Sequence, residues 1–163
     1  METTTKEIQR TTRDWLNSEW DDETLNHSLG LTLTMKQKIS YFRLDPERSE
    51  RNFSHFMNRL EKRTFKSSGK RYKKEIKRFP VLEYTNDRYH YHVLMEIPKF
   101  NNGKRMNKDS FVDLIKDSWR KTNFGYKEVD IQDLHSQNPR GWGFYITKFQ
   151  DSENNRTDWG NVR

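Results

Sequence analysis

Two histidines stand two residues apart in the segment Tyr89-His90-Tyr91-His92. Successive side chains of a β-strand point to opposite faces of its sheet, so on a strand His90 and His92 share one face while Tyr89 and Tyr91 share the other. Two imidazoles about 6–7 Å apart at their Cα atoms can converge on a single metal ion. A pair of surface histidines on an edge strand would have the same spacing, so a third ligand is needed to favour a metal site.

A carboxylate on the preceding predicted strand supplies that third ligand. Asn86-Asp87 is predicted to be the turn of a hairpin, and a two-residue turn places Glu83 directly opposite His90. Directly opposed residues share a sheet face, with Cβ atoms roughly 5 Å apart. The sequence therefore predicts that Glu83, His90 and His92 hold a divalent ion such as Mn²⁺ or Mg²⁺, which suits a mixed nitrogen and oxygen ligand set. A four-residue loop would preserve this arrangement, whereas a bulge or an odd-length loop would break it.

A second pair of reactive side chains lies near the end of the chain. Tyr145 and Lys148 are three residues apart in a segment that Asn138-Pro139 is predicted to open as a helix, so they would be neighbours on one helical face. A tyrosine hydroxyl can act as a covalent nucleophile when a cation assists it, and Lys148 could supply that charge. Packing of Tyr145 with Trp142 and Phe149 in an ordinary core is the alternative interpretation.

Together these motifs resemble the HUH endonucleases, and within them the single-tyrosine Rep proteins that initiate rolling-circle replication of small plasmids, phages and circular single-stranded DNA viruses. The resemblance rests on His90-Tyr91-His92 on a strand, Glu83 one strand earlier, and Tyr145-Ile146-Thr147-Lys148 on a later helix. The strand Leu31-Thr32-Leu33-Thr34 stands where that family has its first motif. Residues 29–150 are covered, and the order of the three motifs carries the likeness.

The resemblance implies a role for each of these residues. Glu83, His90 and His92 would hold the divalent metal, and Tyr145 would attack the scissile phosphate to leave a 5′-phosphotyrosyl link and a free 3′-hydroxyl. Lys148 would steady the nucleophile or the phosphate. The substrate would be single-stranded origin DNA, which the protein would nick and rejoin. A host polymerase would extend the 3′-hydroxyl.

Positive charge is concentrated in one stretch of the chain. The chain of 163 residues has 31 Lys and Arg against 24 Asp and Glu, a net charge of +7, and the stretch 59–78 alone carries an excess of eight basic residues. Localised charge of this kind is typical of a phosphate-contacting surface, although a solvated helix end or a nuclear-targeting sequence would look similar. The residues predicted to contact DNA, from the first-motif strand and from this stretch, are Thr32, Thr34, Lys36, Lys66, Lys70, Arg71, Tyr72, Lys73 and Lys74.

The periodicity of apolar residues predicts the elements that position these side chains. Alternation predicts a strand from residue 31, and Asp45-Pro46 opens a helix with a Phe53, Phe56, Met57, Leu60 stripe that should end near Ser67-Ser68-Gly69. Strands over about 79–85 and 89–97, a helix from about 109, a strand near 127–134 and the helix of Tyr145 follow. This order predicts an α+β fold of the ferredoxin-like, RRM-like split βαβ type, with helices on a central antiparallel sheet.

The chain divides into three parts by composition. Residues 1–28 form a polar arm in which Trp15, Leu16 and Trp20 have helical spacing, residues 29–150 form the HUH domain, and residues 151–163 are predicted to be a disordered tail. The absence of cysteine excludes a disulfide framework and a thiolate metal site. No signal peptide or membrane span is predicted, which favours the cytoplasm of a bacterial host, or the host nucleus if the chain is of eukaryotic viral origin.

Two other interpretations remain open. Gly69-Lys70 lacks the upstream glycine of a phosphate-cradling loop, so the sequence predicts either a separate helicase partner or a fragment of a larger Rep protein. The tyrosine follows the histidines, which argues against the relaxases but is shared by single-tyrosine transposases. The other alternative is a non-catalytic ferredoxin-like nucleic-acid binder whose histidines are incidental.

Overall fold

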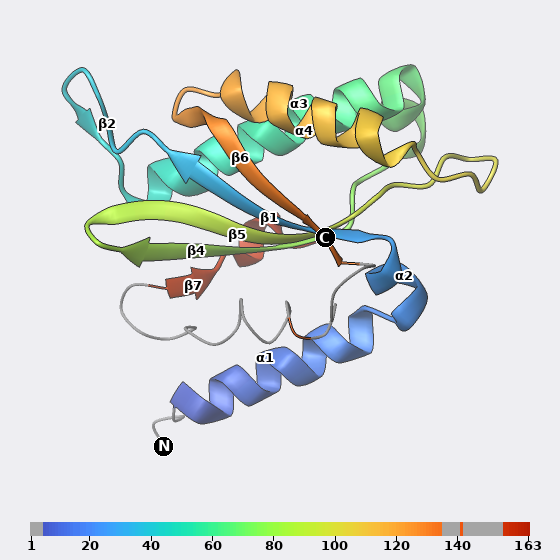
Figure 1. Cartoon of the computed structure of the whole chain (residues 1–163), viewed down its shortest axis with the longest axis horizontal. Coiled ribbons are helices and arrows are strands. Elements are labelled where there is room, and N and C mark those ends of the chain that lie inside the picture. The colour runs from blue at the N-terminus through green and yellow to red at the C-terminus, as the bar shows by residue number, and fades with distance from the viewer. Residues whose placement is uncertain (1–4, 135–140, 142–154) are drawn as a thin grey trace.

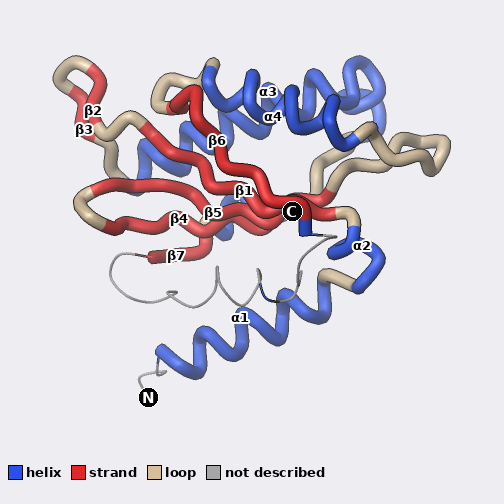
Figure 2. Tube along the Cα trace, in the orientation of Figure 1, coloured by secondary structure: helices blue, strands red, loops and turns tan. Residues whose placement is uncertain are grey.

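The computed structural model describes residues 5–134, 141 and 155–163, and within them the side chains of all but residues 5, 68–72 and 155. Figures 1 and 2 show a sheet with helices above and below it. The elements in chain order are α1 (Thr5–Glu19), α2 (Asp22–Asn26), β1 (Ser28–Met35), β2 (Lys38–Ile39), β3 (Phe42–Arg43), α3 (Pro46–Tyr72), β4 (Arg78–Thr85), β5 (Arg88–Glu96), α4 (Lys108–Arg120), β6 (Gly125–Asp133), β7 (Asn155–Thr157) and the short 3₁₀ helix η2 (Trp159–Asn161).

The predicted fold class is confirmed. The main sheet has five strands in the order β6-β1-β5-β4-β7, and each neighbouring pair is antiparallel. With α3 between β1 and β4, and α4 between β5 and β6, the strands β1, β4, β5 and β6 make the split βαβ arrangement of a ferredoxin-like domain. The small β2–β3 hairpin stands apart from this sheet.

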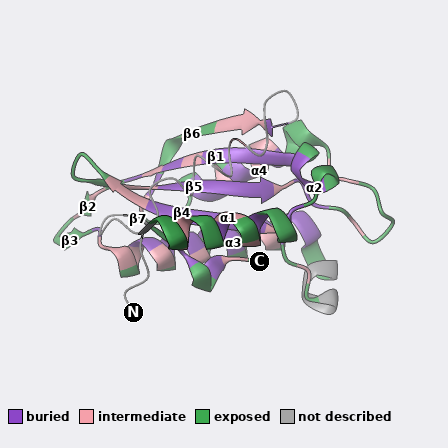
Figure 3. Ribbon diagram, turned by 90° about the horizontal axis from the view of Figure 1, so that it is seen from below, coloured by how far each residue is buried: buried purple, intermediate pink, exposed green. Residues whose placement is uncertain are grey.

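The sheet is covered on both faces, but unequally. Helices α3 and α4 lie above it in Figure 1 and bury the alternate residues Leu29, Leu31, Leu33 and Met35 of β1, each at most 1% exposed. Helix α1 lies below the sheet, where Leu16 and Trp20 belong to a smaller buried cluster. Figure 3, seen from that lower side, shows α1 largely exposed and most of β5 buried. The predicted helical arm is therefore a helix that covers part of the second face.

Helix α3 begins where the sequence predicts and runs further than expected. The Asp45 carboxylate accepts a hydrogen bond from the Arg48 backbone N–H at 2.7 Å, and Pro46 takes the first helical position. At Lys66 the backbone is non-helical, with φ 51° and ψ −133°, and helical structure then resumes to Tyr72. The predicted end near 67–69 is thus a kink, because Glu61 of α3 binds the chain beyond the helix, accepting from the Ile76 N–H at 2.9 Å.

In place of the disorder predicted for 151–163, residues 155–163 are ordered against the domain. Strand β7 pairs with the free edge of β4, and the Arg78 N–H donates to the Arg163 carbonyl at 2.9 Å. The Trp159 ring packs edge-on against Trp15 of α1 at a centroid distance of 5.4 Å. The segment is too polar to predict as core, yet its backbone satisfies hydrogen-bonding groups that β4 would otherwise expose.

Candidate active site

The two strands of the predicted hairpin are joined by the expected two-residue turn. Asn86 and Asp87 both have positive φ, 53° and 59°, as a type I′ turn requires. The register places Glu83 opposite His90 and Thr85 opposite Arg88. No bulge interrupts this pairing, so the predicted parity holds and both histidines share a sheet face with Glu83.

The three predicted ligands converge on one another. The Nε2 atom of His92 lies 2.7 Å from Oε2 of Glu83, and Nε2 of His90 contacts the same carboxylate oxygen. The two imidazole rings meet edge-on with centroids 4.9 Å apart, and one ligand atom from each residue lies within 4.8 Å of the others. The side chains of His90, Glu83 and His92 retain 21, 13 and 10% exposure, so the cluster is largely enclosed but still open on one side.

The surroundings favour the protonation states that bind a metal. Burial acts to raise the pKa of Glu83, but the hydrogen bond from His92 and the charges of the two histidines outweigh it, so the pKa lies below its usual value. Burial lowers the pKa of His92, and the hydrogen bond to Glu83 opposes this only in part. An ionised carboxylate and a neutral imidazole are both ligand-competent, and the donor set fits a divalent ion.

Strand β1 adds a second row of side chains to this face. Thr32 pairs with His92 and Thr34 with His90. The Thr32 hydroxyl oxygen lies 3.3 Å from Nδ1 of His92, the ring nitrogen turned away from Glu83. A partner on the second nitrogen orients a metal-binding histidine. The Thr34 hydroxyl donates instead to the Glu128 carbonyl at 3.1 Å.

Two residues that the sequence analysis missed also belong to this face. Thr85 hydrogen-bonds the Glu83 side chain and contributes to its lowered pKa. Arg88 lies two residues before His90 and pairs with Thr85, so it has the parity of the ligands and is exposed at their edge. The two-residue alternation that identified His90 and His92 could have found both.

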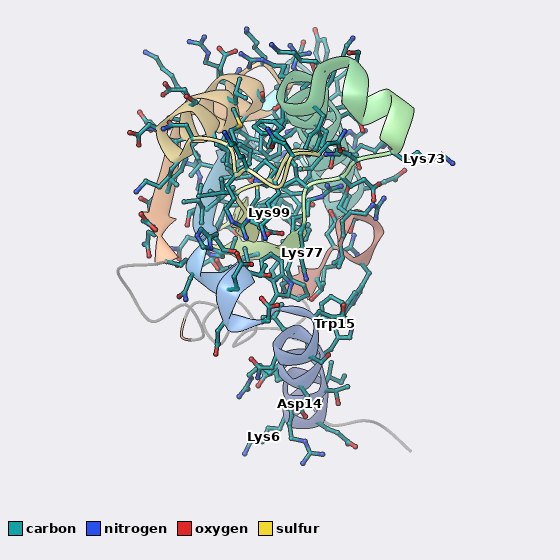
Figure 4. All side chains as sticks on the ribbon, turned by 90° about the vertical axis from the view of Figure 1, so that its right-hand side faces the viewer. Lys6, Asp14, Trp15, Lys73, Lys77 and Lys99 are labelled. Carbon is teal, nitrogen blue, oxygen red and sulfur yellow. The ribbon has the colours of Figure 1, made fainter. Side chains whose placement is uncertain are left out.

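The basic stretch lies away from the ligand cluster. In Figure 1 the end of α3 is on the right and the β4–β5 turn is on the left, and Figure 4 shows Lys73 at the outer end of α3. Lys66 and Lys73 are exposed there, and the Lys74 ammonium lies 5.5 Å from the Phe65 ring centroid. The side chains of Lys70, Arg71 and Tyr72 lie outside the described set. The predicted DNA contacts therefore fall into two groups, of which only Thr32, Thr34 and Lys36 are on or next to the strand beside the histidines.

Some charge of the stretch is structural. Arg78 is 3% exposed and its guanidinium lies 2.5 Å from a Glu61 carboxylate oxygen, while Arg63 pairs with Asp117 of α4 at 2.6 Å. Burial lowers the pKa of Arg78, and the Glu61 charge opposes that shift. Counting charges along the sequence therefore overstates how many cations face the solvent.

Tyr145 and Lys148, predicted as the nucleophile and its partner, lie outside the described residues. The chain on either side of them is described. Leu134 is buried with Val81 and Leu94, which stand two residues from Glu83 and His92 on the same face. On the other side, Asn155 pairs directly with Glu83.

A ferredoxin-like α+β sheet with a His-Glu-His cluster on its face defines a protein of the HUH type. The chain belongs to the replication-associated protein ORF2 family, whose model matches residues 28–156, and it is a rolling-circle replication initiator-like protein. Comparison with curated proteins and with solved structures gave no significant match. None of the described helices is long and apolar enough to span a membrane.

Proposed function

We propose that this protein nicks and rejoins single-stranded DNA to initiate rolling-circle replication, with Tyr145 as the nucleophile. The observation that carries the proposal is the convergence of Glu83, His90 and His92 within 4.8 Å on one sheet face of a replication-associated protein. The same three residues would hold a divalent ion, Mn²⁺ or Mg²⁺. When bound, such an ion supplies Lewis-acid stabilisation of the negative charge on the scissile phosphate.

In the proposed step the Tyr145 phenolic oxygen attacks phosphorus and the bond from phosphorus to the 3′-oxygen breaks. The products are a 5′-phosphotyrosyl DNA and a 3′-hydroxyl, which takes up a proton, while the tyrosine loses one. One phosphodiester replaces another, so the reverse reaction joins DNA ends without ATP. Lys148 would stabilise the phenolate or the phosphate, since a tyrosine is a weak nucleophile at its ordinary pKa.

The anchoring of the chain on both sides of Tyr145 supports this assignment. Asn155, ten residues further along, pairs with Glu83, and Leu134 packs beside the strands that carry the ligands. Extended chain spans at most about 3.6 Å per residue, and helical chain about 1.5 Å. These limits keep Tyr145 within reach of the ligand face.

The partners follow from the chemistry. Single-stranded origin DNA would cross the ligand face beside Thr32 and Thr34, continue along Lys36, and contact the remote lysines of α3 only if the strand is long. A separate helicase would unwind the duplex and a host polymerase would extend the 3′-hydroxyl. The reaction would take place in a bacterial cytoplasm or a host nucleus.

A covalent adduct tests the proposal. The protein would be incubated with Mn²⁺ and a single-stranded oligonucleotide pool that has a randomised window and a 3′-terminal fluorophore, then run on a denaturing gel. A phosphotyrosyl link retains the 3′ segment, so a fluorescent protein band is expected from the wild type. EDTA and Tyr145→Phe should both abolish it.

The matched control is Tyr126→Phe, which alters a tyrosine 40% exposed on β6 and should leave the adduct intact. An adduct from Tyr145→Phe would mean that another residue is the nucleophile. If the wild type gives no adduct from the pool with either metal, the protein is a non-catalytic DNA binder.

A further inference from the structure

A hairpin beside the main sheet presents two aromatic rings to solvent. Strands β2 and β3 pair Lys38 with Arg43 and Ile39 with Phe42, which leaves Ser40 and Tyr41 as the turn. Tyr41 is 95% exposed and Phe42 58% exposed, and only Tyr126 and Trp159 are comparable among the described large apolar side chains. Residues 36–43 also include three basic side chains and no acidic one. Exposed aromatic rings flanked by cations are typical of surfaces that bind unpaired nucleotides.

The hairpin forms one side of a pocket of about 490 Å³, a volume in the range of small-molecule sites. Helix α3 and the turn before β6 form the other sides. The lining residues are Ile39, Phe42, Arg48, Arg51, Asn52, His55, Asn123 and Phe124.

The pocket combines apolar rings with cations. Among its described lining residues none is acidic, and the Arg48 guanidinium lies 5.6 Å from the Phe42 ring centroid. Arg51 pairs with Glu47 at 2.8 Å, but both side chains are about two-thirds or more exposed, so this pair is weak and Arg51 can exchange its partner for a phosphate.

The wall opposite the hairpin is fixed in place. The Asn52 amide donates to the Thr122 hydroxyl at 3.1 Å, and its carbonyl oxygen accepts from the Phe124 N–H at 3.1 Å. These bonds join α3 to the chain that leads into β6. A pocket that is already formed loses little conformational freedom when a ligand binds.

The hairpin is also tied to the strand that carries the histidines. The Gln37 amide donates to the Tyr89 carbonyl at 2.9 Å, and its oxygen accepts from the Tyr89 N–H at 2.7 Å. Tyr89 directly precedes His90, and Thr34, beside His90, is three residues before Gln37. Lys36 lies between them, exposed, where it can bind the backbone of a strand passing from the ligand face to the hairpin.

We propose that the β2–β3 hairpin and its pocket bind an unpaired nucleotide of the substrate strand, outside the cleavage site. The base stacks on the exposed aromatic ring of Phe42 or Tyr41, and a phosphate binds Arg51. This inference rests on the proposed function for the identity of the DNA strand, but the binding it describes needs neither metal nor Tyr145.

Binding is measured by fluorescence anisotropy with labelled oligothymidylate and oligodeoxyadenylate, in EDTA to prevent cleavage and over a series of salt concentrations. The paired substitution Tyr41→Ala and Phe42→Ala should weaken binding about tenfold with an unchanged salt dependence, because stacking releases no counterions. Arg51→Ala should lower the slope of log K against log salt by about 0.7, the value expected when one phosphate fewer is neutralised.

Matched controls are Tyr126→Ala, an exposed ring on β6, and Lys116→Ala, an exposed cation on α4. Both should bind as the wild type does. Wild-type affinity of the Tyr41→Ala and Phe42→Ala protein would overturn the proposal. So would a change in oligomeric state, measured by light scattering, without a change in DNA affinity, since the rings would then be a contact with a second copy.

The adduct assay separates this inference from the proposed function. If wild type binds through the hairpin but never forms an adduct, the endonuclease proposal fails and the nucleotide site stands. If the hairpin variants bind normally while Tyr145 forms its adduct, only the nucleotide site is wrong. At saturating DNA the hairpin variants should form the adduct at the wild-type rate.

Discussion

At the scale of single residues, the geometry of the site depends on a few side-chain contacts around the histidines. Glu83 is shared by both rings, and Thr32 contacts the far nitrogen of His92. A shared carboxylate and an oriented ring reduce the freedom that a metal ion would otherwise have to remove on binding.

Thr32→Val is expected to weaken Mn²⁺ binding roughly tenfold, the lower end of the effect of removing the partner of a ligating histidine. Isothermal titration calorimetry measures this directly. Thr34→Val is the matched control, since that hydroxyl bonds to the Glu128 carbonyl instead of to a ring. Equal affinities for the two variants would show that Thr32 does not orient His92.

Acid should destabilise the metal-free protein through the same cluster. The pKa of His92 and that of Glu83 are both lowered in the folded state. The unfolded chain therefore binds more protons, and the free energy of unfolding falls as pH drops below about 6.5 and then further below about 4.3. Urea denaturation in EDTA at a series of pH values should show this fall.

His92→Gln should flatten the first part of that pH dependence, because glutamine does not titrate. His55→Gln, which changes an exposed histidine of α3, should leave the curve as in the wild type. A wild-type slope in the His92→Gln protein would assign the proton uptake to a different group.

At the scale of elements, β7 and η2 hold the histidine strand from its other face. The Tyr91 hydroxyl, between the two histidines in sequence, donates to an Asp158 carboxylate oxygen at 2.9 Å, and the Asn161 amide donates to the same oxygen at 2.7 Å. Burial raises the pKa of Asp158, and these two hydrogen bonds oppose that shift. The Phe53 ring lies 4.6 Å from the Tyr91 ring, so β5 is fixed by α3 as well.

Tyr91→Phe should lower the free energy of unfolding by about 1–3 kcal/mol, since a buried acceptor loses one of its donors. Chemical denaturation measures the change. Tyr89→Phe, two residues earlier on the same face and only partly buried, should cost less than about half a kcal/mol, the scatter of neutral substitutions. Similar losses for both variants would mean that the Asp158 hydrogen bond contributes little.

At the scale of the whole molecule, charge and chemistry are separated. The ligand cluster and the aromatic hairpin are tied to the same stretch of β5, whereas the exposed lysines of the basic stretch lie at the far end of α3. Such an arrangement suits a long strand bound at two places, with sequence-independent attraction at the distant one.

Replacing Lys73 and Lys74 with alanine should weaken binding of a long single strand and lower its salt slope by roughly 0.7 for each phosphate that is no longer neutralised. Binding of a short strand should not change. The same double replacement at the exposed Lys104 and Lys116 is the control. If short strands lose as much affinity as long ones, the lysines lie on the main DNA path.

The sequence alone was sufficient for the ligand cluster and for the order of the elements. Strand parity and a two-residue turn are local properties, so Glu83, His90 and His92 could be predicted to meet, and the periodicity of apolar residues identified the strands and helices of the α+β fold. The kink at Lys66 lay beyond that pattern, because it follows from contacts of α3 with the chain after it.

Only the tertiary structure decided which distant segments became neighbours. It placed Thr32 beside His92, paired β7 with β4, buried Arg78 against Glu61, and formed the pocket between the hairpin and α3. Each of these depends on strand order and on packing between residues far apart in the chain. No local pattern encodes such pairings, because the free energy that selects them comes from burying whole faces of the sheet.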